Sequence, residues 1–222
     1  MDIIEAIRTR KSIRGYKPAP VPREILEKIL ETAIHAPSGQ NTQPWEITVI
    51  AGEVMEKIKQ AAMEKFSAGE APARPKVSRG PYTGTYRERQ VAIGVQLFQL
   101  MGIAREEKEK RTEWTKRGLR FFDAPAAIII STDESLGPAA QFDVGGISQT
   151  IALVAVNYGL GTCIQIQGVT YPDVIRKYTG IPESKDMIIN LAIGYPDWDF
   201  PANKVQSTRE PLENVVTWCG AD

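Results

Sequence analysis

The chain has 222 residues, enough for one domain of ordinary to large size with a substantial core. Hydrophobic residues make up 42% of it and charged residues 24%, which is typical of a globular protein. Lysine and arginine together number 27, as do aspartate and glutamate, so the formal net charge is zero. This balance disfavours a general nucleic-acid-binding protein, which needs surplus basic charge, but it allows a local pocket for one phosphate.

The number of cysteines and the hydropathy of the chain indicate in which cellular compartment the protein is expected. Cys163 and Cys219 lie far apart in the sequence, so neither a disulfide framework nor a paired-thiol metal site is predicted. The first residues are charged and amphipathic and lack the apolar core of a signal peptide. The most apolar stretch, 147–156, is too short to span a bilayer. We therefore expect a cytoplasmic protein with no membrane and no nucleic acid among its partners.

The first part of the chain predicts two helices and a strand. Asp2 can cap a first helix that carries isoleucines on one side. Closely spaced prolines then require an extended connection, and the last of them, Pro22, suits the first turn of a second helix. This second helix has a core-facing apolar stripe over 25–34 and ends at Pro37. Residues 45–50 are rich in β-branched residues and predict a strand.

The rest of the chain continues the alternation of helices and strands. One helix is expected before the strand 126–132, and a further strand is expected at 187–194. Residues 148–158 are apolar on nearly all sides, which indicates a helix buried in the core or at a subunit contact. The chain turns back near 159–163 as a strand or turn. This order favours one layered domain, 1–222, of the α+β or α/β class.

Two irregular segments stand out. Residues 66–84 contain three glycines and three prolines and predict a long loop, which is either an ordinary surface connection or a lid or pocket wall. Tyr82 and Tyr86 lie at its end. From residue 198 the chain is irregular but partly apolar, and apolar side chains are unfavourable in water. We therefore expect the C-terminal extension 198–222 to dock on another part of the protein, with a partner subunit as one candidate.

Several kinds of catalytic site are disfavoured by residue types. His35 is the only histidine, ends an apolar stripe and has no nucleophile-elbow sequence beside it, so we assign it a structural role. One histidine and two distant cysteines make a zinc site improbable. Neither a Walker A loop nor the dinucleotide-binding fingerprint is present. If the chain is an enzyme, a cofactor should carry the chemistry.

Two segments offer groups that could bind a cofactor. Residues 10–14 read Arg-Lys-Ser-Ile-Arg, which is either a solvated charge cluster or a pocket for a phosphate dianion, since arginine offers forked donors and serine another. Residues 36–45 join a helix end to a strand. Pro37 and Gly39 alone would end the helix, so the polar run from Ser38 to Gln43 could instead present donors and acceptors to a polar heterocycle.

Together and in this order, the two segments resemble the N-terminal signature of the FMN-dependent nitroreductase family. Residues 159–163, 192–197 and 209–212 resemble later segments of the same family, and the similarity covers essentially the whole chain. The details look most like the nitroaromatic and nitrobenzoate reductase branch. The resemblance implies an α+β nitroreductase-like fold, with a central, mostly antiparallel sheet flanked by helices. It also implies a homodimer with shared active sites, in which each C-terminal extension docks on the partner.

The resemblance assigns one end of the cofactor to a set of polar side chains. The FMN phosphate and ribityl chain would be held by Arg10, Lys11, Ser12 and Arg209. Arg14 would lie near the pyrimidine edge of the flavin and stabilise the charge of the reduced ring. The chain departs from some relatives by having Gln-Ser-Thr rather than a further cation before Arg209, which leaves more of the phosphate binding to residues 10–12.

The other flavin contacts implied by the resemblance come from two separate segments. The partner subunit would contribute Ser38, Gly39 and Asn41, so a complete site would need a dimer. The segment beside the ring would be Gln165, Ile166 and Gln167, with a backbone N–H aimed at the flavin N5.

The implied activity is an oxidoreductase reaction in which NAD(P)H and a small nitroaromatic, quinone or conjugated acceptor use one pocket in turn, giving ping-pong kinetics. Aromatic side chains would line that pocket, with ordinary core packing as the alternative for each: Tyr82, Tyr86, Trp114, Phe121 and Phe122. Alternatives within the family are reductive dehalogenation, flavin fragmentation and enone reduction. Outside the family's chemistry, the chain could be a non-catalytic flavin-binding protein or a cofactor-free interaction domain.

Overall fold

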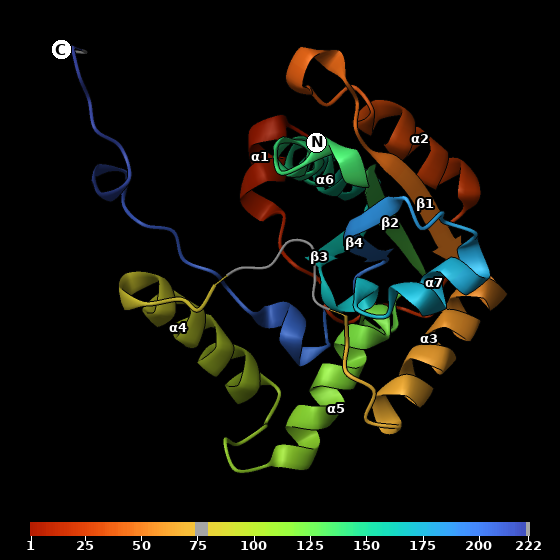
Figure 1. Ribbon diagram of the computed structural model, residues 1–222. Coiled ribbons are helices and arrows are strands. Elements are labelled where there is room, and N and C mark those ends of the chain that lie inside the picture. The colour runs from red at the N-terminus through yellow and green to blue at the C-terminus, as the bar shows by residue number, and fades with distance from the viewer. Residues whose placement is uncertain (74–79, 221–222) are drawn as a thin grey trace.

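A computed structural model describes residues 1–73 and 80–220 and contains an antiparallel sheet covered by helices (Figure 1). The four strands have the spatial order β1 (Glu46–Ala51), β2 (Ala126–Asp133), β4 (Lys185–Gly194) and β3 (Gly161–Gln165). The α-helices of the described residues are α1 (Ile3–Thr9), α2 (Arg23–Ala33), α3 (Gly52–Ser67), α4 (Gly84–Leu100), α5 (Lys108–Leu119), α6 (Ala139–Asn157) and α7 (Pro172–Thr179). All three strand pairs are antiparallel, which confirms the predicted α+β class.

The sheet separates two apolar layers. Successive side chains of a strand point to opposite faces, so Ile128 and Ile130 of β2 pack with α2 and α6, while Ile129 packs with α3, α5 and α7. All three isoleucines are fully buried. Because both faces of β2 are covered, its sequence is a continuous apolar run rather than an alternating one. That run is why the strand could be predicted from sequence.

Helix α6 is the longest element and lies against the sheet. By length and composition alone it could cross a membrane, and at 19 residues it is longer than the apolar stretch 147–156 that the sequence suggested. It contacts α1, α2, β3 and β4, and the side chains of Ile147 and Ile151 have no exposed surface. Its apolar character is therefore explained by packing on several sides, as expected for a core helix.

Two expectations about the helices need correction. The single helix predicted before the strand 126–132 is two helices, α4 and α5, because the chain turns at Gly102, whose φ of +63° favours glycine. The helix predicted at 148–158 begins earlier, at Ala139. The first turns contain polar residues such as Asp143, so they do not match the apolar pattern that predicted the helix. In the fold, Asp143 is nevertheless buried, at 9% exposure.

The C-terminal extension has two parts with different surroundings. Its beginning, η5 (Pro201–Lys204), packs on the same chain, with Ala202 and Asn203 buried, so the expectation that all of 198–222 docks on a partner is wrong for this part. The later part runs past α4, to which it is joined by a 3.0 Å ion pair between Arg89 and Glu210, and then extends away from the body (Figure 1). Helix α4 itself has no buried residue. Docking of the later part on a partner stays a prediction.

We expect Ile151→Ala to lower the free energy of unfolding by about 2–5 kcal/mol, because the substitution leaves a cavity between α6 and the sheet. Gln149→Ala on the exposed side of the same helix is the matched control and should change stability by less than about 0.5 kcal/mol. Urea denaturation of both variants measures the difference. Equal stabilities would contradict the buried position of Ile151.

Candidate functional site

The cationic segment 10–14 is fixed beside the edge strand β3. Ser12 forms a parallel bridge with Thr162, and the Ile13 N–H donates to the Thr162 carbonyl oxygen at 2.9 Å. This close approach requires glycine at position 161, where a Cβ would lie 2.4 Å from the Ile13 side chain. The backbone of the predicted phosphate segment is thus held by strand pairing, although its side chains are polar.

Cations from opposite ends of the chain meet at this edge. Burial, followed by the nearby charge of Arg209, lowers the pKa of Arg10, and burial also lowers the pKa of Lys11. Within residues 1–73 and 80–220, no carboxylate forms an ion pair with Arg10, Lys11, Arg14 or Arg209. Like charges gathered without a counter-charge form a site for a multiply charged anion, such as a phosphate.

The backbone at Arg14 is held by Asn203 of η5. The Arg14 N–H donates to Asn203 Oδ1 at 2.7 Å, and Asn203 Nδ2 donates to the carbonyl oxygens of Gly15 at 2.7 Å and Asp197 at 2.6 Å. Asn203 itself is 1% exposed, and its bond to Gly15 is buried while those to Arg14 and Asp197 are partly buried. Sequence reasoning missed Asn203, because a single asparagine in an irregular segment carries no signal of a long-range contact.

A second polar feature lies at the far end of β3. Gln165 is buried at 8% exposure, and neither atom of its side-chain amide has a hydrogen-bond partner. Asn190, its registered neighbour on β4, is likewise buried and unpartnered. A buried, unsatisfied polar group typically costs about 1–3 kcal/mol. Thr162 beside the cations and Gln165 are three residues apart, or about 10 Å along the strand. The two ends of β3 therefore offer an anion site and free amide groups.

The polar segment 38–43 has a tightly held and unusual backbone. The Gln43 N–H donates to Ser38 Oγ at 2.9 Å, and the Gly39 N–H lies 3.3 Å from both carboxylate oxygens of Asp143. Gln40, Asn41 and Gln43 all have φ between 46° and 59°, a conformation that is uncommon outside glycine. Such strain is often found at functional sites.

Within one chain, the segments 10–14 and 38–43 are associated with opposite ends of α6. Gly39 bonds to Asp143 in the first turns of the helix, whereas Ser12 and Ile13 pair with Thr162 of β3, the strand that begins just after α6 ends at Asn157. Asp143 and Asn157 are separated by about 21 Å of helix at 1.5 Å per residue. The structure therefore does not bring Ser38, Gly39 or Asn41 to the cationic cluster of the same chain.

Comparison with known proteins places this geometry in a family. Residues 7–195 match the sequence profile described as the Nitroreductase family. The chain belongs to the nitroreductase family. This confirms the predicted family, its oxidoreductase class and the α+β fold.

Individual relatives agree over nearly the whole chain. Nitrobenzene nitroreductase of Ectopseudomonas oleovorans is 32% identical, with 97% of this chain and 96% of the relative aligned. The crystal structure of the FMN and NADPH-dependent nitroreductase NfnB from Sphigopyxis sp. strain HMH superposes with a TM-score of 0.95 at 30% identity, covering 100% of both chains. Iodotyrosine deiodinase of Danio rerio is 37% identical, covering 93% of this chain and 63% of the relative.

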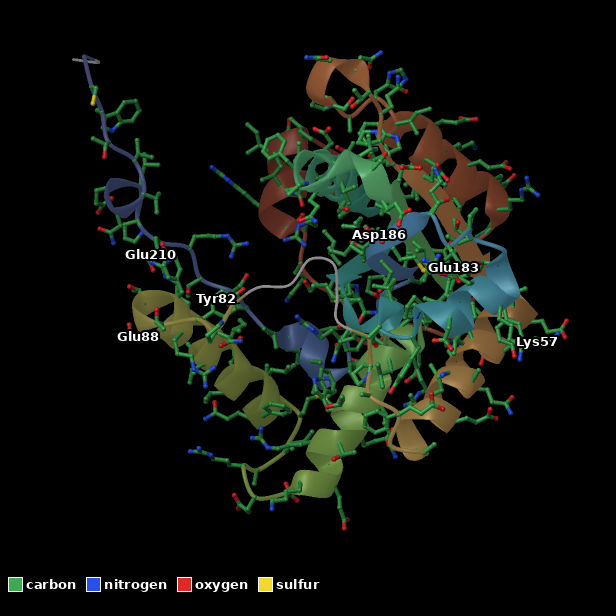
Figure 2. All side chains as sticks on the ribbon, in the orientation of Figure 1. Lys57, Tyr82, Glu88, Glu183, Asp186 and Glu210 are labelled. Carbon is green, nitrogen blue, oxygen red and sulfur yellow. The ribbon has the colours of Figure 1, made fainter. Side chains whose placement is uncertain are left out.

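The predicted aromatic residues occupy different environments in this nitroreductase-family chain. Phe122 is 4% exposed and packs in the core, with its ring centroid 5.7 Å from that of Trp114. Phe122 and the fully buried Phe121 therefore pack in the core of this chain, which is the alternative stated for both, and substrate binding by Phe122 stays a prediction. Tyr86 on α4 is 67% exposed. Figure 2 shows Tyr82 near the start of α4, on the side of Glu88 and Glu210.

The predicted lid 66–84 is described only in part. Its first two residues belong to α3, and Gly84 begins α4. The segment after α3 is attached near α7: the Ala73 N–H donates to the Thr170 carbonyl oxygen at 2.8 Å, and the Tyr171 hydroxyl donates to the Glu70 carbonyl oxygen at 3.0 Å. Residues 74–79 lie outside the described residues. This attachment places the start of the loop next to η4 (Gln167–Val169), which follows β3.

We expect Asn203→Ala to lower the free energy of unfolding by about 2–3 kcal/mol, because it leaves buried groups of Arg14, Gly15 and Asp197 without partners. Asn214→Ala is the matched control: Asn214 is exposed, and among the described residues its side chain bonds only to Glu210, so its loss should cost less than about 0.5 kcal/mol. Chemical denaturation of the flavin-free protein measures both. Indistinguishable stabilities would remove Asn203 as the residue that joins the two ends of the chain.

Proposed function

We propose that the chain is an FMN-dependent oxidoreductase that takes electrons from NAD(P)H and reduces small nitroaromatic, quinone or conjugated acceptors. One observation carries this proposal: unpaired cations lie beside one end of β3, at Thr162, and the unpartnered amide of Gln165 belongs to the other end, about 10 Å further along the strand backbone. A single ligand with a phosphate at one end and a polar heterocycle at the other suits both, and FMN is such a ligand. The names of the related nitroreductases support the same choice of cofactor and reaction.

The chain's own residues bind and orient the cofactor in this proposal. Arg10, Lys11, Ser12 and Arg209 hold the phosphate and ribityl end, where the anion relieves the repulsion between the two guanidinium groups. Arg14 places a fixed positive charge at the pyrimidine edge, which favours the electron-rich ring. When bound, FMN supplies a two-electron carrier that accepts hydride from NAD(P)H and returns it to the acceptor.

The ring side of the proposed site is formed at the end of β3 and in η4. Gln165, Ile166 and Gln167 lie beside the ring, and the Gln165 amide can donate and accept hydrogen bonds with a heterocycle edge. No protein acid or base is required, since solvent supplies the protons.

The proposed assembly is a homodimer in which Ser38, Gly39 and Asn41 act in the partner's site. Two observations support it. In one chain, the segment 38–43 bonds to the beginning of α6, whereas the segment 10–14 pairs with the strand that follows its end. The exposed large apolar side chains also include two groups of three, on α1 at Ile3, Ile4 and Ile7 and in the C-terminal extension at Leu212, Val215 and Trp218. Apolar groups exposed together typically mark an interface.

The absorbance spectrum of the purified protein tests the cofactor and the electron donor. We expect a flavin band that bleaches on anaerobic addition of NADPH or NADH and returns on addition of a nitroaromatic. Arg10→Gln should weaken FMN binding roughly tenfold to a hundredfold, because a charge-assisted hydrogen bond to phosphate is lost. Arg23→Gln on the exposed surface of α2 is the charge-matched control and should bind FMN like the unmodified protein.

Each outcome of the spectrum separates one function from another. A bound flavin that no pyridine nucleotide bleaches would contradict the oxidoreductase assignment and favour a non-catalytic flavin-binding protein. Protein that stays colourless after FMN is supplied would contradict flavin binding altogether.

Mixed dimers test the shared site. Arg10→Gln and Asn41→Ala should each lower activity, but a one-to-one mixture refolded together should recover about a quarter of the unmodified activity, because half the dimers then contain one intact site. A mixture of Arg10→Gln and Arg209→Gln is the control, since both residues act in the same site and no intact site can form. Absence of recovery in the first mixture would show that Asn41 does not act across the dimer.

A second candidate reaction is reductive dehalogenation of a halotyrosine, which the 37% identity to iodotyrosine deiodinase favours. The two reactions share a flavin site and differ in the acceptor. Oxidation of the prereduced protein by iodotyrosine, compared with nitrobenzene under the same anaerobic conditions, decides between them. Faster reoxidation by iodotyrosine would place the chain with the dehalogenases.

A further inference from the structure

We propose that Arg117 on α5 is a positioning residue that holds together the two backbone segments facing the flavin ring, at Arg14 and at Gln167–Gly168. The inference rests on the proposed function for the identity of the ring. The contacts themselves belong to the flavin-free chain and can be tested without the cofactor.

The guanidinium of Arg117 makes contacts in several directions. One terminal nitrogen lies 3.3 Å from the carbonyl oxygens of both Arg14 and Phe122, and the other is 2.7 Å from the Asp123 carboxylate. The guanidinium carbon lies 4.6 Å from the centroid of the Phe200 ring. The planar fork of arginine permits these contacts at once, whereas the single ammonium of lysine cannot reproduce them.

The first segment held by Arg117 is the backbone at Arg14 and Gly15. Arg117 donates to the Arg14 carbonyl oxygen, while Asn203 accepts from the Arg14 N–H. Phe200, which lies under the Arg117 guanidinium, also packs on Gly15, where a Cβ would be 2.2 Å from its ring. The peptide groups on both sides of the Arg14 Cα are therefore fixed, and with them the origin of the Arg14 side chain.

The second segment is the turn η4, which follows β3. Helix α5 supports it directly, because a Cβ at Gly118 would lie 2.2 Å from the Gln167 side chain. The following turn, η2 (Phe121–Asp123), supports it as well, since a Cβ at Gly168 would be 2.4 Å from the Phe121 ring. Any shift of α5 and η2 must therefore move Gln167 and Gly168.

The backbone of η2 needs the contacts of Arg117. Phe121, Phe122 and Asp123 have φ values of 57°, 54° and 58°, and the left-handed conformation costs roughly 1–2 kcal/mol per non-glycine residue. Such a turn persists only when its surroundings hold it. Arg117 bonds to both the Phe122 carbonyl oxygen and the Asp123 carboxylate. One side chain thus stabilises the turn that supports Gln167–Gly168 and also holds Arg14.

The positions that Arg117 fixes affect binding of the reduced flavin more than binding of the oxidised flavin. The fixed charge of Arg14 and the backbone N–H groups of η4 stabilise electron density on the ring only when both are held in place before reduction. Arg117 therefore acts through other residues and does not touch the ring. Its loss should weaken binding of reduced FMN more than binding of oxidised FMN.

Arg117→Lys and Arg120→Lys form a matched pair of variants. Arg120 is exposed to the same extent, 24% against 23%, and also pairs with Asp123, at 2.9 Å, and with Glu113, at 3.0 Å. Among the described residues, Arg120 makes no hydrogen bond to Arg14. The pair separates the effect on Arg14 from a general loss of ion pairs in η2.

The first measurement is the two-electron midpoint potential of bound FMN. We expect Arg117→Lys to reduce the preference for reduced over oxidised FMN at least tenfold, which lowers the potential by about 30 mV or more. Arg120→Lys should keep the unmodified potential. An unchanged potential in Arg117→Lys, or an equal shift in both variants, would overturn the inference.

The second measurement is hydrogen–deuterium exchange of the flavin-free protein. The amide of Arg14 should exchange roughly tenfold faster in Arg117→Lys than in Arg120→Lys, because its local opening is easier. Equal exchange in the two folded variants would contradict the positioning role. If unmodified protein binds no FMN but the exchange difference is present, the proposed function fails while the structural role of Arg117 stands.

Phe200→Leu, which removes the ring under the guanidinium, should give an intermediate exchange rate and provides a second variant should Arg117→Lys unfold.

Discussion

The side-chain amide of Asn203 joins the two ends of this chain, and the geometry of the candidate site depends on that junction. Its oxygen accepts from Arg14 and its nitrogen donates to Gly15 and Asp197. Asn203 adds to the strand pairing of Ser12 and Ile13 with Thr162, and together these contacts keep the cationic N-terminal segment beside β3. By fixing this segment, the amide also brings Arg10 near Arg209, which follows Asn203 by six residues. Hydrogen bonds in the buried interior thus hold like charges together at the surface.

The features that destabilise this fold are concentrated where the cofactor is proposed to bind. The pKa of Arg10 is lowered by burial and by Arg209, and the amide of Gln165 is buried without a partner. Among the described residues, every non-glycine residue with positive φ lies at 40–43 or 121–123. The first of these segments is a proposed flavin contact, and the second supports η4. Unfavourable backbone conformations and unpartnered buried groups are typically found at functional sites, where a bound ligand or neighbouring contacts offset their free-energy cost.

How far the sequence predicts this structure depends on the range of the interactions involved. The strands β1, β2 and β4 could be predicted because β-branched runs favour strands locally, and α2 because its apolar stripe has helical spacing. The family signature in 10–14 and 36–45 also identified the fold. The burial of Phe122 could not be predicted because it depends on contacts with Trp114, eight residues earlier, and with the rest of that core layer. Asn203 and Arg117 escaped notice because their bonds to Arg14 and Gly15 span 103 to 189 residues of the chain.

The length of α6 separates the two proposed flavin-binding segments of one chain, and in the proposed function this separation links chemistry to association. Two segments associated with opposite ends of a helix about 21 Å apart cannot contact one ligand ring from the same subunit. In the proposed dimer, the partner's segment fills the gap, so flavin binding and subunit association stabilise each other by mass action. The exposed apolar residues of α1 and of the C-terminal extension then serve the active site as much as the interface, because a substitution there would weaken cofactor binding without touching the cofactor.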